Sequence, residues 1–399
     1  MVERRTRVGI VVGYFDWFSG YQETALASAL SKVAHTEVIA SDRVNPTFTD
    51  GHLQRLGIPR RYAPSTVIEQ GVRVTRFAST ELRSMVWSSR AAGYLAHRSY
   101  DLVVQVMPGQ LFSVAATLAR NPAPRVVLYG DNRAMWSHLP RWQRLVKGAV
   151  FGATKGALYT AVNARALVSY GYTPDTLDRL RPFRAGRPIS VMPLAFSPER
   201  SYLDADLRRQ FREELNLAED QVLVLSAGKI EPRKRLDWLI SAFTSIAAQR
   251  SDVHLLLVGA DSSDYAGQIG ETIRTSPLRH RMHVLPFTDA AGLNAVFNGA
   301  DLGVWPRNPA ITIQQAMGTG LPVLLPQNSL VGHLIKPGSG HYFDLDETRG
   351  EESLTHGLDH ALGHTAFSMA ARRDRARTNR WLGADSLAHE LLMTIGSGT

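Results

Sequence analysis

A chain of 399 residues exceeds what one ordinary hydrophobic core organises, which predicts two domains. It contains no cysteine, which excludes disulfides, thiol catalysis and cysteine-ligated zinc and fits a reducing cytosol. The formal net charge of +9 favours anionic partners such as nucleotides, phosphorylated lipids or membranes, whereas the spacings and aromatic–basic motifs of nucleic-acid-binding proteins are missing.

Short apolar runs, each followed by a helical period, recur along the chain in two series. Runs that are apolar on both faces and alternate with helices predict two doubly wound parallel sheets. The first series of predicted strands comprises 6–13, 36–40, 71–78, 101–107, 124–130, 157–162 and 188–192. The second comprises 222–226, 254–259, 282–287, 301–305 and 321–326. No apolar window is long enough to span a membrane, and the N-terminus lacks the cleavage site of a signal peptide.

The two series meet at MPLAFSPERSYLDAD (192–206), which lacks a helical period and carries two prolines. We therefore predict an N-terminal domain over 1–193 and a C-terminal domain over 194–379, with a helix over about 380–399 packing back on the first. Open α/β sheets bind ligands at the carboxyl ends of their strands. Two such sheets are expected to face a central cleft that holds the site.

The stretch AGKIEPRKRLDWLISAF (227–243) concentrates positive charge directly after the predicted strand 222–226. The pair Ala227-Gly228 allows a close turn at the edge of the sheet. Lys229 and Lys234 then lie near the N-terminus of the following helix, where ammonium groups and the helix dipole together favour a phosphate. A solvated basic loop is the alternative.

This stretch resembles the signature of family 4 of the retaining nucleotide-sugar glycosyltransferases, which have the GT-B fold. Gly228, Pro232 and Lys234 match the family pattern, while Lys229 replaces an arginine and Arg235 replaces a glycine. The resemblance implies an acceptor-binding first domain and a donor-binding second domain. It also implies that Lys229 and Lys234 are the catalytic groups that hold the donor diphosphate.

Other segments extend the resemblance over the chain. RMHVLPFTD (281–289) is similar to the family's strand and turn against the base, which makes Pro286 and Phe287 donor-binding candidates. SGYQETALASALSK (19–32) resembles the first glycine loop, where Gly20 keeps the glycine beside the donor phosphate. Ser19 replaces the other glycine and could equally be an ordinary helix N-cap. The remaining matches are MPLAFSPERS, HLLLVGADS and NGADLGVWP.

The segment WPRNPAITIQQAMGTGLPVLLP (305–326) resembles the donor loop and helix of the family, but both of its acids are replaced, by Arg307 and Gln315. The carbonyl oxygen of Gln315 can accept a hydrogen bond from a ribose hydroxyl. Arg307 is grouped with the donor-binding residues without an assigned role. The helix would begin beneath the diphosphate, where the backbone amides of Ala310, Ile311 and Thr312 can donate to it. The Thr312 hydroxyl would add a fourth donor.

Three further features bear on catalysis and metal binding. The family often has a histidine after a first-domain strand, and PRVVLYGDN (124–132) has Asp131 there, which makes Asp131 the catalytic candidate of this domain. The sequence DAD (204–206) matches a metal motif of the other glycosyltransferase fold, but we predict a helix cap. His356, His360 and His364 recur on one helix face, which we predict to be solvated. No metal and no cofactor is expected.

The resemblance implies transfer of a sugar from a nucleotide diphosphate sugar to an acceptor hydroxyl with retention of configuration. The leaving diphosphate, held by positive groups, would help to take the acceptor proton. A non-catalytic GT-B-like binding or partner subunit and a GT-B nucleotide-sugar epimerase are the alternatives. The expected location is the cytoplasm, including a peripheral position on the inner face of the membrane.

The segment 132–174 indicates what kind of acceptor the protein binds, because it contains basic residues but neither Asp nor Glu. Within it, Trp142, Leu145, Val146 and Ala149 share one face of a predicted helix, with basic residues along the flank. Such a helix can lie on an anionic membrane. It can equally pack on its own sheet, and the pattern slightly favours this. We nevertheless hypothesise an anionic or lipid-linked acceptor ahead of a soluble aglycone.

Overall fold

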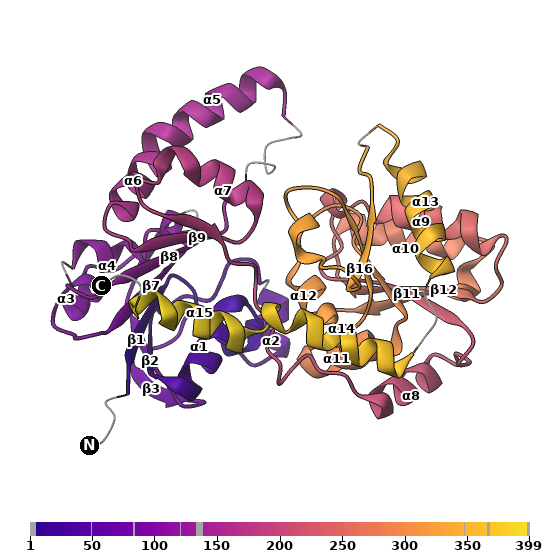
Figure 1. Ribbon diagram of the computed structural model, residues 1–399, viewed down its shortest axis with the longest axis horizontal. Helices are drawn as coiled ribbons and strands as arrows, with labels where there is room; N and C mark the ends of the chain where they lie inside the picture. The colour runs from indigo at the N-terminus through magenta and orange to yellow at the C-terminus, as the bar shows by residue number, and fades with distance from the viewer. Residues whose placement is uncertain are drawn as a thin grey trace. The chain divides into compact units, whose positions relative to one another are not determined.

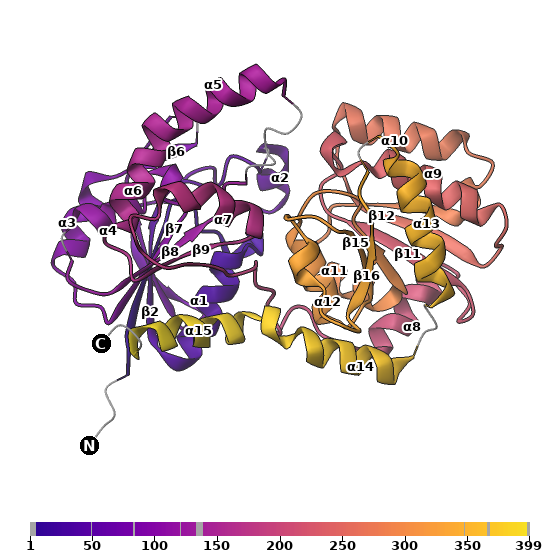
Figure 2. The same ribbon diagram turned by 45° about the horizontal axis from the view of Figure 1, so that its top comes forward.

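The computed structural model describes residues 5–48, 50–82, 84–119, 121–132, 139–346, 348–364 and 368–396, with only the backbone of His52 and Arg55. The described chain divides into two compact units, 1–193 with 384–399, and 194–383. Each unit is an α/β domain whose helices cover its own, mainly parallel sheet (Figure 1, Figure 2).

The first unit is built on an eight-stranded sheet in the order β10-β9-β8-β7-β1-β2-β4-β3. All neighbouring strands are parallel except β3, which is antiparallel to β4 at the edge. Its central strands are buried along nearly their whole length, as expected for a sheet covered on both faces. The strands are β1 (Arg7–Val12), β2 (His35–Ser41), β3 (Thr66–Glu69), β4 (Val72–Phe77), β7 (Leu102–Val106), β8 (Arg125–Tyr129), β9 (Val168–Gly171) and β10 (Ile189–Val191), and β5 (Thr80–Leu82) and β6 (Met85–Trp87) form a separate hairpin.

The C-terminal helix α15 (Ala384–Gly396) belongs to the first unit, where it packs beside α1 (Figure 1). Lys32 of α1 forms an ion pair of 2.9 Å with Asp385. The preceding residues 379–382 form the short turn η9 of the second unit. The other helices of the first unit are η1 (Trp17–Ser19), α1 (Gln22–Val33), α2 (Asp50–Arg55), α3 (Ser89–Ala96), η2 (Pro108–Gln110), α4 (Val114–Leu118), α5 (Arg141–Phe151), the π-helix η4 (Gly152–Gly156), α6 (Ala157–Asn163), α7 (Pro174–Leu180) and η5 (Arg181–Phe183).

One predicted strand of this unit is wrong, and the alternative of Ser19 as a helix cap is excluded. Residues 157–162 are not a strand but most of α6, because Tyr159 and Val162, three positions apart, are buried on one helix face. The next strand is instead β9, which begins at Val168. Ser19 does not cap α1, which has Tyr21 at its N-cap; the Ser19 hydroxyl donates to the Asp16 carbonyl oxygen.

The second unit is built on a six-stranded, fully parallel sheet in the order β13-β12-β11-β14-β15-β16. Asp204 caps α8 as predicted, since its side chain accepts from the amides of Asp206 and Leu207. The strands are β11 (Val222–Ala227), β12 (Val253–Ala260), β13 (Met282–Pro286), β14 (Leu302–Val304), β15 (Val323–Pro326) and β16 (Gly340–Phe343). The helices are α8 (Ala205–Glu214), η6 (Pro232–Lys234), α9 (Leu236–Ala247), α10 (Asp264–Thr275), η7 (Arg279–Arg281), α11 (Ala290–Gly299), α12 (Ile311–Gly318), η8 (Gly332–Leu334), α13 (Gly350–Gly363), α14 (Met369–Thr378) and η9 (Asn379–Leu382).

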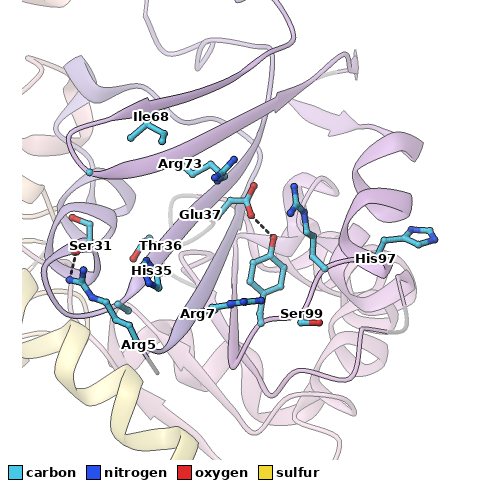
Figure 3. A pocket seen from close by; sticks show the side chains of 14 residues that line it. Arg5, Arg7, Ser31, His35, Thr36, Glu37, Ile68, Arg73, His97 and Ser99 are labelled. Carbon is cyan, nitrogen blue, oxygen red and sulfur yellow. Dashed lines mark hydrogen bonds between the residues drawn. The ribbon is translucent and has the colours of Figure 1, made fainter. Parts of the chain in front are cut away.

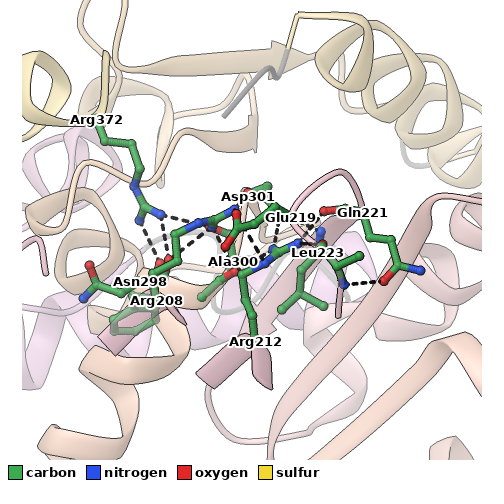
Figure 4. Close-up of polar contacts among 12 residues, drawn as sticks. Arg208, Arg212, Glu219, Gln221, Leu223, Asn298, Ala300, Asp301 and Arg372 are labelled. Carbon is green, nitrogen blue, oxygen red and sulfur yellow. Dashed lines mark hydrogen bonds and ion pairs between the residues drawn. The ribbon is translucent and has the colours of Figure 1, made fainter. Parts of the chain in front are cut away.

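A buried charged cluster ties α8, α11 and α14 to the sheet (Figure 4). Asp301 forms ion pairs with Arg208 at 2.9 Å and with Arg212 at 3.0 Å. Arg372 donates to the carbonyl oxygens of Asn298 and Ala300 at 2.9 and 3.0 Å, where α11 ends and its last carbonyls lack helical partners. The cluster is structural, because its guanidinium groups donate to an acid or to backbone carbonyl oxygens of the same unit.

Candidate functional site

The turn after β11 brings a lysine and the start of α12 against a glycine. Gly228 has a φ of +119°, and a Cβ placed there would lie 2.8 Å from Lys234 Nζ and 3.4 Å from Thr312 Oγ1. Gly259, at the end of β12, approaches the same turn so closely that its own Cβ would lie 2.6 Å from the Gly228 carbonyl oxygen. Only glycines allow this approach of two strand ends, a lysine and a helix terminus.

The four basic residues of this turn are not equivalent. Arg233 pairs with Glu231 at 2.8 Å, and Arg235 pairs with Asp237 at 2.7 Å. Lys229 and Lys234, in contrast, make no hydrogen bond or ion pair with any residue that the structure describes. The positive charge that remains for an anion is therefore that of the two lysines.

Lys234 is also buried, with 9% of its surface exposed. Burial lowers its pKa to about 8; Glu231 opposes this shift, while Arg233 and Lys229 add to it. An ammonium group in such surroundings is short of a counter-charge. A bound anion would supply that charge and raise the pKa again.

The start of α12 offers backbone donors to the same place. Its N-cap is Ala310, whose side chain cannot accept a hydrogen bond from the first amides, and no other side chain caps it. The amides of Ile311 and Thr312 therefore remain open. The Thr312 hydroxyl, which the sequence suggested as a ligand donor, instead donates to the Ala227 carbonyl oxygen at 2.7 Å, and Trp305 Nε1 donates to the same oxygen at 2.9 Å. These two bonds fix α12 against the end of β11.

Gln315 lies three residues after Thr312 and hence on the same side of α12. Its Oε1 atom is buried and has no hydrogen-bond partner in the described part of the chain. An unpaired buried carbonyl is costly, so it suits a hydroxyl brought by a ligand. The neighbouring Gln314, which sequence reasoning passed over, has an equally buried and unpaired Oε1.

The other predicted donor-binding residues of this unit are less closely gathered. Pro286 ends β13, the edge strand that is separated from β11 by β12, and Phe287 follows with 54% of its surface exposed. Both lie at the carboxyl edge of the sheet, like Gly228. Arg307 lies between β14 and α12. The structure thus brings together Gly228, Lys234, Ala310 and Thr312.

Two predicted residues lie in the first unit. Gly20 ends η1 with a φ of +63°, and a Cβ there would meet nothing within 4 Å. Asp131 follows β8 and accepts a hydrogen bond from the Tyr159 hydroxyl, and Lys155 Nζ lies 3.5 Å from its Oδ1. The sequence did not single out Tyr159, because 157–162 was predicted to be a strand, and it gave Lys155 no role beyond the basic segment 132–174.

A cavity lies at the amino-terminal edge of the first sheet (Figure 3). It has a volume of about 510 Å³ and is lined by basic side chains, among them Arg7, Arg73 and Arg98. Glu37 projects into it and accepts from the Tyr100 hydroxyl at 2.9 Å and from the Tyr94 hydroxyl at 2.6 Å. Ligands of α/β sheets bind at the other edge, so this cavity is a poor substrate site.

Within the described ranges, no group of three or more His, Asp or Glu side chains is arranged to hold a metal ion. His360 and His364 lie with ring centroids 4.5 Å apart, and their neighbour is His341 rather than His356. No helix in the described chain is long and apolar enough to cross a bilayer.

Comparison with known proteins agrees with this architecture. Residues 208–362 match the sequence model of the family Glycosyl transferases group 1, a span that includes β11, its basic turn and α12. Sucrose-phosphate synthase from Thermosynechococcus elongatus is 16% identical with a TM-score of 0.69, covering 99% of this chain and 100% of that one. HepE from Anabaena, in complex with UDP, is 16% identical with a TM-score of 0.67, covering 98% and 100%. The fold is therefore GT-B.

Among curated proteins, the lipopolysaccharide 1,2-N-acetylglucosaminetransferase of Salmonella typhimurium is 25% identical over 205 residues. The match covers 47% of this chain and 51% of that protein, so the chain spans about half the length of this relative.

Proposed function

We propose that the protein is a glycosyltransferase that transfers a sugar from a nucleotide diphosphate sugar to an acceptor hydroxyl with retention of configuration. The observation that carries the proposal is the convergence on Gly228 of Lys234, which lacks a counter-charge, and the uncapped start of α12. Ammonium and backbone N–H groups that point to one place are the usual partners of a diphosphate. The matched family and the UDP-bound relative favour the same chemistry.

In this proposal the donor lies along the carboxyl edge of the second sheet. Lys229, Lys234 and the amides of α12 hold the diphosphate, and the unpaired Gln315 carbonyl oxygen accepts from a ribose hydroxyl. Pro286 and Phe287 provide an exposed apolar surface for the base. Arg307 is given no specific role in donor binding.

Bond cleavage between the sugar and the diphosphate leaves negative charge on the departing phosphate. Positive groups that are already in position stabilise this charge more in the transition state than in the ground state. The departing phosphate oxygen can then take the proton of the attacking acceptor hydroxyl on the same face, which retains the configuration. In this proposal protein groups rather than a metal ion stabilise the departing phosphate, and treatment with EDTA is expected to leave the rate unchanged.

Asp131 is proposed as the acceptor-side group. Tyr159 donates to one of its oxygens and Lys155 lies 3.5 Å from the other, so both side-chain oxygens are oriented by neighbouring residues. An oriented carboxylate can accept a hydrogen bond from an acceptor hydroxyl. We further propose an anionic or lipid-linked acceptor, because the basic segment around Lys155 contains no acid between 132 and 174.

The test is turnover of a panel of UDP-, ADP- and GDP-sugars by the wild type and by Lys229→Ala and Lys234→Ala. Each variant should lose roughly 2–4 kcal/mol of transition-state stabilisation. Arg233→Ala removes the same charge from the same turn, but its partner Glu231 already neutralises it, so it should retain near-normal turnover. The anomeric proton of the product, followed by NMR, reports retention.

The same panel separates the alternatives. Binding of nucleotide without turnover of any sugar would identify a non-catalytic subunit, and a changed sugar without transfer would identify an epimerase. Normal turnover in both lysine variants would contradict the proposed site.

A further inference from the structure

Helix α5 carries a set of large apolar side chains that nothing in the described chain covers. Trp142 is 65% exposed, Leu145 67%, Val146 55% and Val150 58%. Packing on its own sheet, which the sequence slightly favoured, is therefore wrong for this helix. Elsewhere on the described surface, exposed large hydrophobic residues are distributed over many elements rather than gathered on one helix.

The helix is anchored to its unit at one end only. Phe151, its last residue, is buried, with ring centroids 5.7 Å from Tyr159 and 5.9 Å from Phe183. The residues before it lie on the outside of the unit, beyond α6 and α7 (Figure 1, Figure 2). The burial of Phe151 fixes the direction of the helix while leaving its apolar face open.

The exposed residues are ordered by type around the helix. At roughly 100° per residue, the four apolar side chains and Ala149 occupy an arc of about 140°. Arg141 and Lys147 lie on either side of this arc, about 40° and 60° beyond its edges, and Arg144 lies opposite it. The whole helix is free of acidic residues. This combination of an aromatic-bearing apolar face and a basic flank is typical of helices that lie in the interface of a membrane.

We propose that α5 is a docking surface for an anionic lipid bilayer. Its apolar face would enter the boundary between headgroups and acyl chains while its basic flank meets anionic headgroups. Charge complementarity decides against a second copy of this chain: pairing two α5 faces would bring their basic flanks together, and α5 has no acid to offset them. The net charge of +9 likewise favours an anionic surface over a second copy of this chain. This inference does not depend on the donor chemistry.

The first test is co-sedimentation with vesicles of phosphatidylcholine, with and without phosphatidylglycerol, at low and high salt. Binding should require phosphatidylglycerol and weaken with salt. Each basic residue near an anionic surface contributes about fivefold in affinity, so Arg141→Glu/Arg144→Glu should weaken binding by at least roughly 30-fold. The matched control, Arg90→Glu/Arg373→Glu, makes the same charge change at exposed residues of other helices and should bind nearly as the wild type does.

The second test addresses the apolar face. Trp142→Ser/Leu145→Ser should weaken vesicle binding by roughly tenfold or more, since buried apolar area drives interfacial binding. Leu82→Ser/Met393→Ser changes two other exposed apolar residues and should have little effect. Unfolding temperature and nucleoside diphosphate affinity, measured for each variant, exclude misfolding because the substituted α5 residues are exposed and lie outside the donor site.

Three results would overturn the proposal. The first is failure of the wild type to bind anionic vesicles at low salt. The second is equal loss of binding in the α5 variants and their controls. The third is a dimer in sedimentation without lipid that the α5 substitutions dissociate, which would assign the face to a second copy.

Discussion

Replacing Lys234 by methionine should make the ligand-free protein more stable and, at the same time, remove its affinity for a nucleoside diphosphate. Lys234 is 9% exposed, and its pKa falls from 10.5 to about 8 on burial. A base whose pKa is lower in the folded state destabilises that state while it is protonated, here by about 3 kcal/mol at about 1.4 kcal/mol per pKa unit. Methionine keeps an apolar stem of similar length without the buried charge.

The pH dependence follows from the same shift. The penalty is fully present below pH 8, declines between pH 8 and 10.5, and is absent above that range, because only there is the lysine neutral in both states. The advantage of Lys234→Met over the wild type should therefore be largest at neutral pH and vanish near pH 11.

Thermal unfolding with and without UDP, ADP or GDP measures both effects. A gain of 3 kcal/mol corresponds to roughly 6–12 °C in Tm for a unit of this size, which sets the upper end of the expected increase. Nucleotide should raise the Tm of the wild type and leave that of the variant unchanged. Arg233→Met is the control, since its side chain is exposed and paired. A Lys234→Met protein that is less stable at neutral pH would contradict the burial penalty of the lysine. A variant that still responds to nucleotide would contradict the role of Lys234 in binding it.

Four further outcomes are expected. Gln315→Leu should weaken nucleoside diphosphate binding by roughly 1–3 kcal/mol in calorimetric titration, whereas Gln315→Glu should be tolerated; unchanged affinity in the leucine variant would remove the ribose contact. Gly228→Ala should lose binding and stability together, because the added Cβ meets Lys234 Nζ at 2.8 Å and φ is +119°, and a Tm equal to the wild type would contradict this. Arg235→Gly should be about 1 kcal/mol more stable in urea than Arg235→Ala, because position 235 has a φ of +53°; equal stabilities would show that this backbone is not strained. Asp131→Asn should lower turnover without changing nucleotide affinity, and a parallel loss of affinity would place Asp131 outside the acceptor role.

The fold follows from the sequence wherever a strand is apolar on both faces. Runs such as VLVLS (222–226) and DLVVQVM (101–107) are buried strands in the structure, as predicted. The strand prediction is wrong at 157–162, because this short apolar run fits strand and helix periods alike and the packing of Tyr159 favours the helix. Short edge strands such as β3, exposed along its length, carry no such signal.

The candidate site is partly visible in the sequence. The glycine, the lysines and the helix start are recognisable from residue types, but which basic side chains remain unneutralised depends on how the turn folds Arg233 onto Glu231 and Arg235 onto Asp237. The use of the Thr312 hydroxyl by the Ala227 carbonyl is likewise a property of packing.

The surface of α5 shows a different limit. An amphipathic helix with a basic flank has one pattern whether it packs on a sheet or lies on a bilayer. Only the exposure of Trp142 and Leu145 distinguishes the two.

The most direct test of the central claim is calorimetric titration of the wild type, Lys229→Ala, Lys234→Ala and Arg233→Ala with UDP, ADP and GDP. The account predicts that the wild type binds at least one of the three, that both lysine variants lose most of this affinity, and that Arg233→Ala retains it because Glu231 already neutralises Arg233. Equal losses of affinity in all three variants would show that the turn binds nucleotide only as a diffuse basic surface. Unchanged affinity in both lysine variants would place the diphosphate elsewhere and contradict the account.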